Sequence, residues 1–145
     1  WIIAAKNIFA FVTGKLAGPD GRPRHSWRAG QARHPATLED LAQMGRAALA
    51  LHEATGEGSY LEAAEKFAAL ADAHYWDKGE GGYFLSAAAV ADVIQRSKPL
   101  FANATPSGNG AMAEVLSAGV VITIFGLITV AAGGVAWLLP AIRDS

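Results

Sequence analysis

Apolar side chains recur every three or four positions along three stretches of the chain, and this spacing is typical of amphipathic α-helices. The first helix is expected from Trp1 to about Leu16, before Gly18 and Pro19 interrupt the pattern. The second is expected to begin near residue 37 and the third near residue 59. The side chains expected to be buried are Leu38, Leu41, Met44, Ala48 and Leu51 in the second helix, and Tyr60, Ala63, Ala64, Phe67, Leu70 and Ala71 in the third.

Residues that favour helix ends mark the second and third helices. Thr37 followed by Asp40 has the spacing of a capping box, in which each side chain accepts a bond from the other residue's backbone N–H. Gly56 suits the left-handed position after a helix, and Ser59 with Glu62 repeats the capping-box spacing. A further helix is expected from about residue 110. The pattern therefore predicts antiparallel helical hairpins.

A polar loop is expected between the first two helices, from Arg22 to Pro35. Between Gly21 and Leu38 there is no acidic residue, whereas the basic residues are Arg22, Arg24, His25, Arg28, Arg33 and His34. This cluster has two interpretations, a solvated loop or a contact with an anion such as a phosphate or a lipid headgroup. The net charge of the chain is −1, so overall electrostatics predict no nucleic-acid partner.

The C-terminal part of the chain is strongly apolar, and no charged residue occurs from Val115 to Ile142. Leu116 to Leu139 would form a helix of roughly 36 Å, against a bilayer core of about 30 Å. The sequence therefore predicts a single-pass transmembrane helix of unknown orientation, with the lipid bilayer as a partner. The expected domains are a helical-hairpin module at 1–114, a transmembrane helix at 115–142 and a polar tail at 143–145. The alternative is a buried helix of the globular fold.

Small residues line one side of this apolar segment. They are Gly119, Thr123, Gly126, Thr129 and Gly133. Small side chains allow helices to approach closely in lipid, where association depends on packing. We expect this side to pack against other transmembrane helices of a complex. The alternative is that glycine is simply common in membrane helices.

Several motifs occur in an order that points to one family. They are His25-Ser26-Trp27-Arg28, Leu51-His52-Glu53-Ala54-Thr55-Gly56-Glu57, Gly81-Gly82-Tyr83-Phe84 and Asn103-Ala104-Thr105-Pro106-Ser107-Gly108-Asn109. Over residues 1–116 the chain resembles bacterial relatives of the spermatogenesis-associated thioredoxin-like proteins. That resemblance implies an (α/α)6 toroid, similar to sugar 2-epimerases and six-hairpin glycosidases, of which this chain would cover about two hairpins. The family's thioredoxin-like domain has no counterpart here.

The candidate chemistry lies in the predicted loops and helix starts. If the chain is part of an enzyme, Glu39 is a candidate general base and Asp77 a second candidate catalytic acid. The alternatives without catalysis are that Glu39 complements the helix start and that Asp77 belongs to a turn that needs glycine. His25, Trp27 and Arg28 are candidate substrate-binding residues for a sugar ligand, with Trp27 stacking on the ring. A tryptophan that closes a hairpin is the alternative reading of Trp27.

No cofactor or metal is expected. The chain has no cysteine, which excludes disulfides, thiolate catalysis and cysteine metal ligands. The spacing of His52 and His74 fits no zinc motif. Taken together, the sequence predicts an all-α, membrane-anchored protein of partial toroid fold. Its expected role is a non-catalytic accessory or scaffolding subunit of a membrane complex. The alternative is a fragment of an epimerase- or glycosidase-like, carbohydrate-active toroid enzyme.

Overall fold

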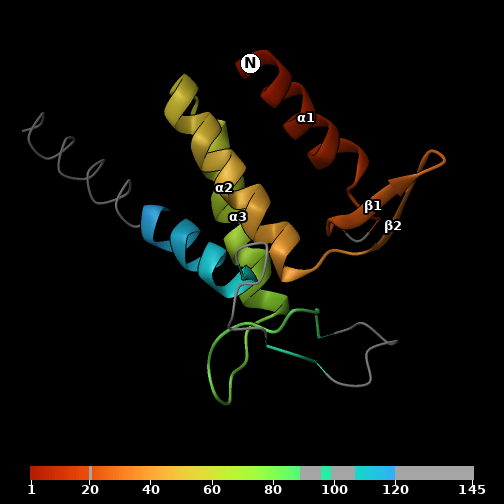
Figure 1. The fold of residues 1–145 in the computed structure, drawn as a ribbon, viewed down its shortest axis with the longest axis vertical. Helices are drawn as coiled ribbons and strands as arrows, with labels where there is room; N and C mark the ends of the chain where they lie inside the picture. The colour runs from red at the N-terminus through yellow and green to blue at the C-terminus, as the bar shows by residue number, and fades with distance from the viewer. Residues whose placement is uncertain (20, 89–95, 99–106, 120–145) are drawn as a thin grey trace, which may run out of the picture.

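The structure, a computed structural model, describes residues 1–19, 21–88, 96–98 and 107–119. Helix α1 (Ile2–Lys15) is followed by strands β1 (Arg24–Arg28) and β2 (Gln31–Pro35), then by helices α2 (Leu38–Thr55) and α3 (Gly58–His74). A fourth helix begins at residue 108 and is described as far as residue 119. In Figure 1 this last helix crosses the lower part of the α2–α3 pair, on the side away from the strands.

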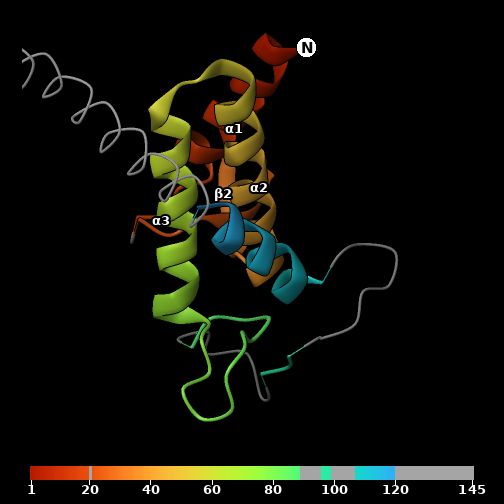
Figure 2. The ribbon, with the colours of Figure 1, turned by 90° about the vertical axis from the view of Figure 1, so that its left-hand side faces the viewer.

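Helices α2 and α3 form an antiparallel hairpin, and its caps follow from the sequence. Thr37 and Asp40 make the predicted capping box, and Gly56 ends α2 in the left-handed conformation with a φ of 72°. The predicted capping box at Ser59 is wrong. Helix α3 begins earlier, at Gly58, and its N-cap residue Glu57 makes no capping hydrogen bond through its side chain. The tight connection leaves the two helices side by side along their length (Figure 2).

The core lies where α2 meets α3 and the fourth helix. Leu38, Leu41 and Met112 are the largest fully buried side chains. The fourth helix fits closely because Gly45 in α2 has no side chain; a Cβ there would lie 3.0 Å from a methyl group of Val115. Burial of Val115 and Met112 contributes about 1.5–3 kcal/mol each to folding. An ion pair of 2.9 Å between Arg46 and Glu114 joins the same two helices at the surface.

Helix α1 packs on the hairpin mainly through one residue. Phe9 is its buried side chain, and its ring meets Tyr60 and Phe67 of α3 edge-on at 5.5 and 6.5 Å between centroids. Other large apolar side chains of α1 stay exposed, including Ile3 at 75% and Ile8 at 65%. The expected helix is confirmed, but α1 lacks a clear polar face because its few polar side chains, Lys6, Asn7, Thr13 and Lys15, do not gather on one side of the helix.

The predicted polar loop from Arg22 to Pro35 is wrong, and so is the all-α fold class. Strands β1 and β2 pair as an antiparallel hairpin. Its two-residue turn has positive φ at both Ala29 (51°) and Gly30 (76°), which is the geometry of the type I′ turns that suit the twist of a hairpin. The strands carry few apolar residues, so they lack the alternation from which a strand is normally recognised.

The predicted transmembrane helix requires a second correction. Within the described ranges, no helix combines the length and the apolar character needed to span a bilayer. The fourth helix instead buries Ala111, Met112 and Val115 in the core. This finding contradicts the membrane-anchored, single-pass architecture, and the function and location predicted from it. The rest of the expected span, with Thr123, Gly126, Thr129 and Gly133, lies outside the described residues.

Candidate binding site

A cavity of about 470 Å³ lies where β1 and the first turns of α2 face α1. Its volume is in the usual range for small-molecule sites. The polar lining comes from β1 and α2, and the apolar lining comes from Val12 of α1, its C-cap residue Leu16, Pro23 before β1 and Met44 of α2. The lining residues are Val12, Leu16, Pro23, Arg24, His25, Glu39, Asp40, Gln43 and Met44.

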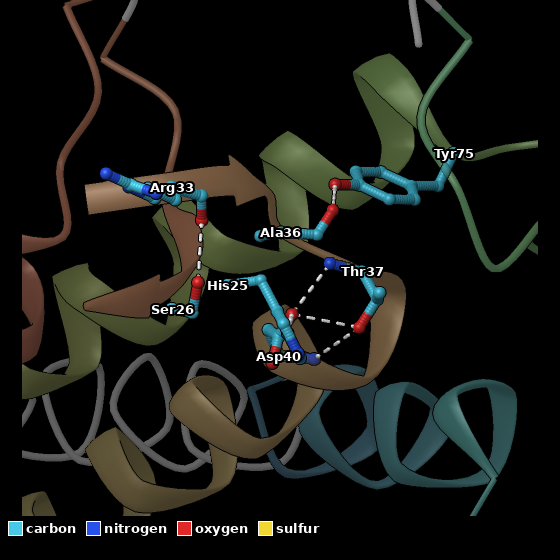
Figure 3. Close-up of polar contacts among 7 residues, drawn as sticks. All are labelled: His25, Ser26, Arg33, Ala36, Thr37, Asp40 and Tyr75. Atoms are coloured by element: carbon cyan, nitrogen blue, oxygen red, sulfur yellow. Dashed lines mark hydrogen bonds and ion pairs between the residues drawn. The ribbon is translucent and has the colours of Figure 1, made fainter. Parts of the chain in front are cut away.

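His25 is held at this cavity by Asp40. Its Nδ1 lies 2.7 Å from Asp40 Oδ2, and the same oxygen accepts bonds from the backbone N–H of Thr37 at 2.7 Å and the Thr37 hydroxyl at 2.9 Å (Figure 3). A carboxylate only accepts hydrogen bonds, so the Nδ1 of His25 is the donor. In the neutral ring, Nε2 is then left as the acceptor. Asp40 therefore caps α2 and also fixes the orientation and tautomer of His25.

Glu39 and Gln43 present further polar groups from α2. They are four residues apart, so they lie on one face of the helix, and both line the cavity. The fourth helix packs against the base of the Glu39 side chain at Gly108, where an added Cβ would lie 3.2 Å from Glu39 Cγ and 3.0 Å from Leu38 Cδ2. Close packing at Gly108 thus supports the part of α2 that carries Glu39.

Of the residues predicted to bind a substrate, only His25 joins Glu39 at the cavity. Trp27 lies on the same face of β1 as His25, but its ring meets Phe11 of α1 edge-on at 5.8 Å and is 39% exposed. Arg28 is exposed at the turn end of β1, on the opposite face of the strand. Neither side chain is part of the cavity lining.

Asp77, the other predicted catalytic acid, also lies away from the cavity lining. It follows α3 in a turn, where its Oδ1 accepts a bond of 2.8 Å from the Gly79 N–H and its Oδ2 pairs with Lys98. The hydrogen bond from Lys98 lowers the pKa of the Asp77 carboxyl. The turn closes through Gly81 and Gly82, both at positive φ. The contacts of Asp77 are those of a residue that stabilises a turn.

The sequence did not single out Gln43 for this site, although its position four residues after Glu39 is a detectable signal. The sequence indicates Arg24 only as a member of the basic cluster. The sequence gives no signal that Val12 of α1 and its C-cap residue Leu16 line the cavity, because this depends on how α1 docks. Among the described residues, no three His, Asp or Glu side chains gather so as to hold a metal ion.

Comparison with known proteins finds partial sequence similarity to spermatogenesis-associated protein 20 of several mammals. No family model matches the chain. Human spermatogenesis-associated protein 20 is 33% identical over 121 residues, which cover 77% of this chain but 14% of the human protein. The mouse protein of the same name is 41% identical over 80 residues, covering 54% of this chain and 10% of its own length. This weak, partial homology supports the predicted relation, and the chain spans a small fraction of its relatives.

Proposed function

We propose that this chain is a helical-hairpin module that binds a small polyhydroxylated ligand, such as a sugar, in the cavity between β1 and α2. One observation carries the proposal: His25, oriented by Asp40, and Glu39 line a single cavity of about 470 Å³. They come from different elements, a strand and a helix start, and their convergence is what a ligand site requires.

The chemistry of the lining suits alternating hydroxyl groups and C–H faces. His25 Nε2 and the Glu39 carboxylate accept hydrogen bonds from hydroxyls, whereas the Gln43 amide both donates and accepts. The apolar side chains of Val12, Leu16 and Met44 also line the cavity and suit the C–H face of a sugar ring. Mostly apolar walls with a few fixed polar groups are the usual composition of small-molecule pockets.

We propose further that the α2–α3 hairpin belongs to a ring of α/α hairpins like the toroids of sugar-acting proteins. Three features support this: the antiparallel hairpin, the fourth helix packed against it and the partial homology to spermatogenesis-associated protein 20. In such a ring Glu39, at the start of α2, is placed to accept a proton from a bound hydroxyl if the complete protein performs catalysis.

Calorimetric titration with a panel of monosaccharides tests the binding proposal. At least one sugar is expected to bind to the unmodified chain, and His25→Ala or Glu39→Gln should weaken that binding about tenfold or more. His52→Ala and Glu53→Gln are matched controls near the far end of α2, where His52 Nδ1 contacts the Glu57 carbonyl at 2.9 Å. They should leave binding unchanged.

Trp27→Ala separates this site from the tryptophan-centred site expected from the sequence. A small effect supports the cavity, whereas a complete loss of binding would favour stacking on Trp27. If no sugar binds, or if the cavity variants bind as well as the unmodified chain, the proposal is wrong.

A further inference from the structure

The β1–β2 hairpin carries a pair of arginines that the proposed sugar cavity does not use. The strand register pairs Arg28 with Gln31 and Ser26 with Arg33. Directly paired residues share a face of the ribbon, and so do residues two apart along one strand. Arg28, Arg33, Ser26 and Gln31 therefore lie on one face, with the two arginines as diagonal neighbours across the strands, at a spacing of roughly 7–8 Å.

Arg24 lies on the same face but nearer the helices, where it lines the cavity, whereas Arg28 and Arg33 lie farther along the hairpin towards its turn. The opposite face carries His25 and Trp27, which contact Asp40 of α2 and Phe11 of α1. In Figure 3 the Arg33 guanidinium extends away from the His25–Asp40 pair. Arg28 and Arg33 are both exposed.

A hydrogen bond to a neighbouring side chain sets the position of the Arg33 guanidinium group. Arg33 Nη2 donates a hydrogen bond of 3.0 Å to Gln31 Oε1, and Gln31 is the residue directly opposite Arg28. The Arg33 guanidinium group is thus held next to the strand pair that contains Arg28. Like charges directly opposite each other across two strands are destabilising, and the repulsion between these diagonal neighbours is a weaker form of the same effect.

No acid of the hairpin offsets this repulsion. The segment from Gly21 to Leu38 contains no Asp or Glu. Asp40, which follows it, is engaged with His25 and Thr37 on the other side of the ribbon, and Glu39 lines the cavity there. A bound anion on this face would therefore relieve the repulsion between the two arginines.

We propose that Arg28 and Arg33 form a binding site for the phosphate group of a soluble phosphate monoester. A guanidinium group can donate two parallel hydrogen bonds to phosphate oxygens. Two guanidinium groups on one face can therefore bind a phosphate dianion from two sides. The Ser26 hydroxyl shares this face. The tight turn at Ala29 and Gly30 keeps both strands in register, so the pair is positioned before the ligand arrives. The site is separate from the sugar cavity, and its existence does not depend on the proposed function.

Titration of the folded chain with inorganic phosphate and with glycerol phosphate, at an ionic strength of about 20 mM, tests the proposal. Saturable binding is expected, weakened about tenfold in Arg28→Gln or Arg33→Gln and weakened by raising the salt to about 200 mM. Arg46→Gln is the matched control because Arg46 lies on α2, away from the β1–β2 hairpin, and pairs with Glu114 of the fourth helix. It should bind phosphate like the unmodified chain.

Three results overturn the proposal. One is the absence of saturable phosphate binding by the unmodified chain. Another is equal binding by the Arg28→Gln and Arg33→Gln variants, provided their helical circular dichroism shows that they fold. The third is binding to phosphatidic acid vesicles without binding to either soluble phosphate, which would assign the arginine pair to a lipid surface. His25→Ala should leave phosphate binding intact, so failure of the sugar site and failure of this site are distinguishable.

Discussion

The contact between Gly45 and Val115 offers the sharpest test of how the fourth helix packs. Val115 was the first residue of the predicted membrane span, yet it is 3% exposed and faces α2. Gly45→Ala has two opposing effects. It removes a helix-interior glycine, which favours folding by about 0.8–1 kcal/mol. It also places a methyl group 3.0 Å from Val115 Cγ2, and overpacking of this kind costs about 1–3 kcal/mol.

The cost of the clash exceeds the gain in helix propensity, so Gly45→Ala should lower the free energy of unfolding by about 1 kcal/mol. Val115→Ala alone should lower it by about 1.5–3 kcal/mol, because two buried carbons are lost and a cavity remains. In the double variant, the methyl group added at position 45 occupies part of that cavity without a clash. Gly45→Ala should therefore stabilise the Val115→Ala chain, and the interaction free energy of the double-mutant cycle should favour the pair by about 1–2 kcal/mol.

Urea unfolding followed by far-ultraviolet circular dichroism measures all four free energies. The slopes of the four transitions should agree, so that differences in midpoint report differences in stability. If Gly45→Ala stabilises the unmodified chain by the full helix-propensity gain and the two effects are additive, then Gly45 and Val115 are not in contact. The packing of the fourth helix on α2 would then be refuted.

The remaining predictions concern the site and its supports. Asp40→Ala should lower the free energy of unfolding by about 1–2 kcal/mol in urea, because it removes the acceptor of the hydrogen bonds from the Thr37 N–H and hydroxyl, and it should also weaken sugar binding by releasing His25. Ala29→Gly should raise stability by about 0.5–1 kcal/mol, since alanine at a φ of 51° is strained, and an unchanged urea midpoint would contradict this. Burial raises the pKa of the Tyr75 hydroxyl to about 12, so the folded state holds this proton more tightly than the unfolded state does. Stability should be complete below pH 10 and fall as the pH rises from 10 to 12, and Tyr75→Phe should reduce that fall in pH-dependent unfolding.

The helices of this chain were predictable because their signals are local. The Thr37–Asp40 capping box and Gly56 set the ends of α2 as expected. The apolar stripe of α2 also reached the core, with Leu38, Leu41, Ala48 and Leu51 buried. These features depend on residues within one or two turns of each other, so a single sequence contains them.

The errors have different physical origins. The strands of the β-hairpin are mostly polar, and their pairing is fixed by the turn at Ala29 and Gly30 rather than by a buried face. Val115 was assigned to a membrane span because its apolar character alone does not specify what covers it. Gly45, against which Val115 packs, is 70 residues away in the chain. Composition identifies a residue that must be buried, but only packing identifies its partner.

The same distinction explains the candidate site. The sequence leaves two interpretations of the acids at the start of α2, helix capping and ligand chemistry. Asp40 combines both, because it takes part in the capping box and also contacts His25 at the cavity. Its Oδ2 accepts bonds from Thr37 and from His25 at once. Because one oxygen serves both partners, the capping geometry that begins α2 also sets the position of the His25 ring. Any change that loosens the cap must therefore disturb the cavity, and the stability of α2 and the shape of the binding site are linked through one carboxylate.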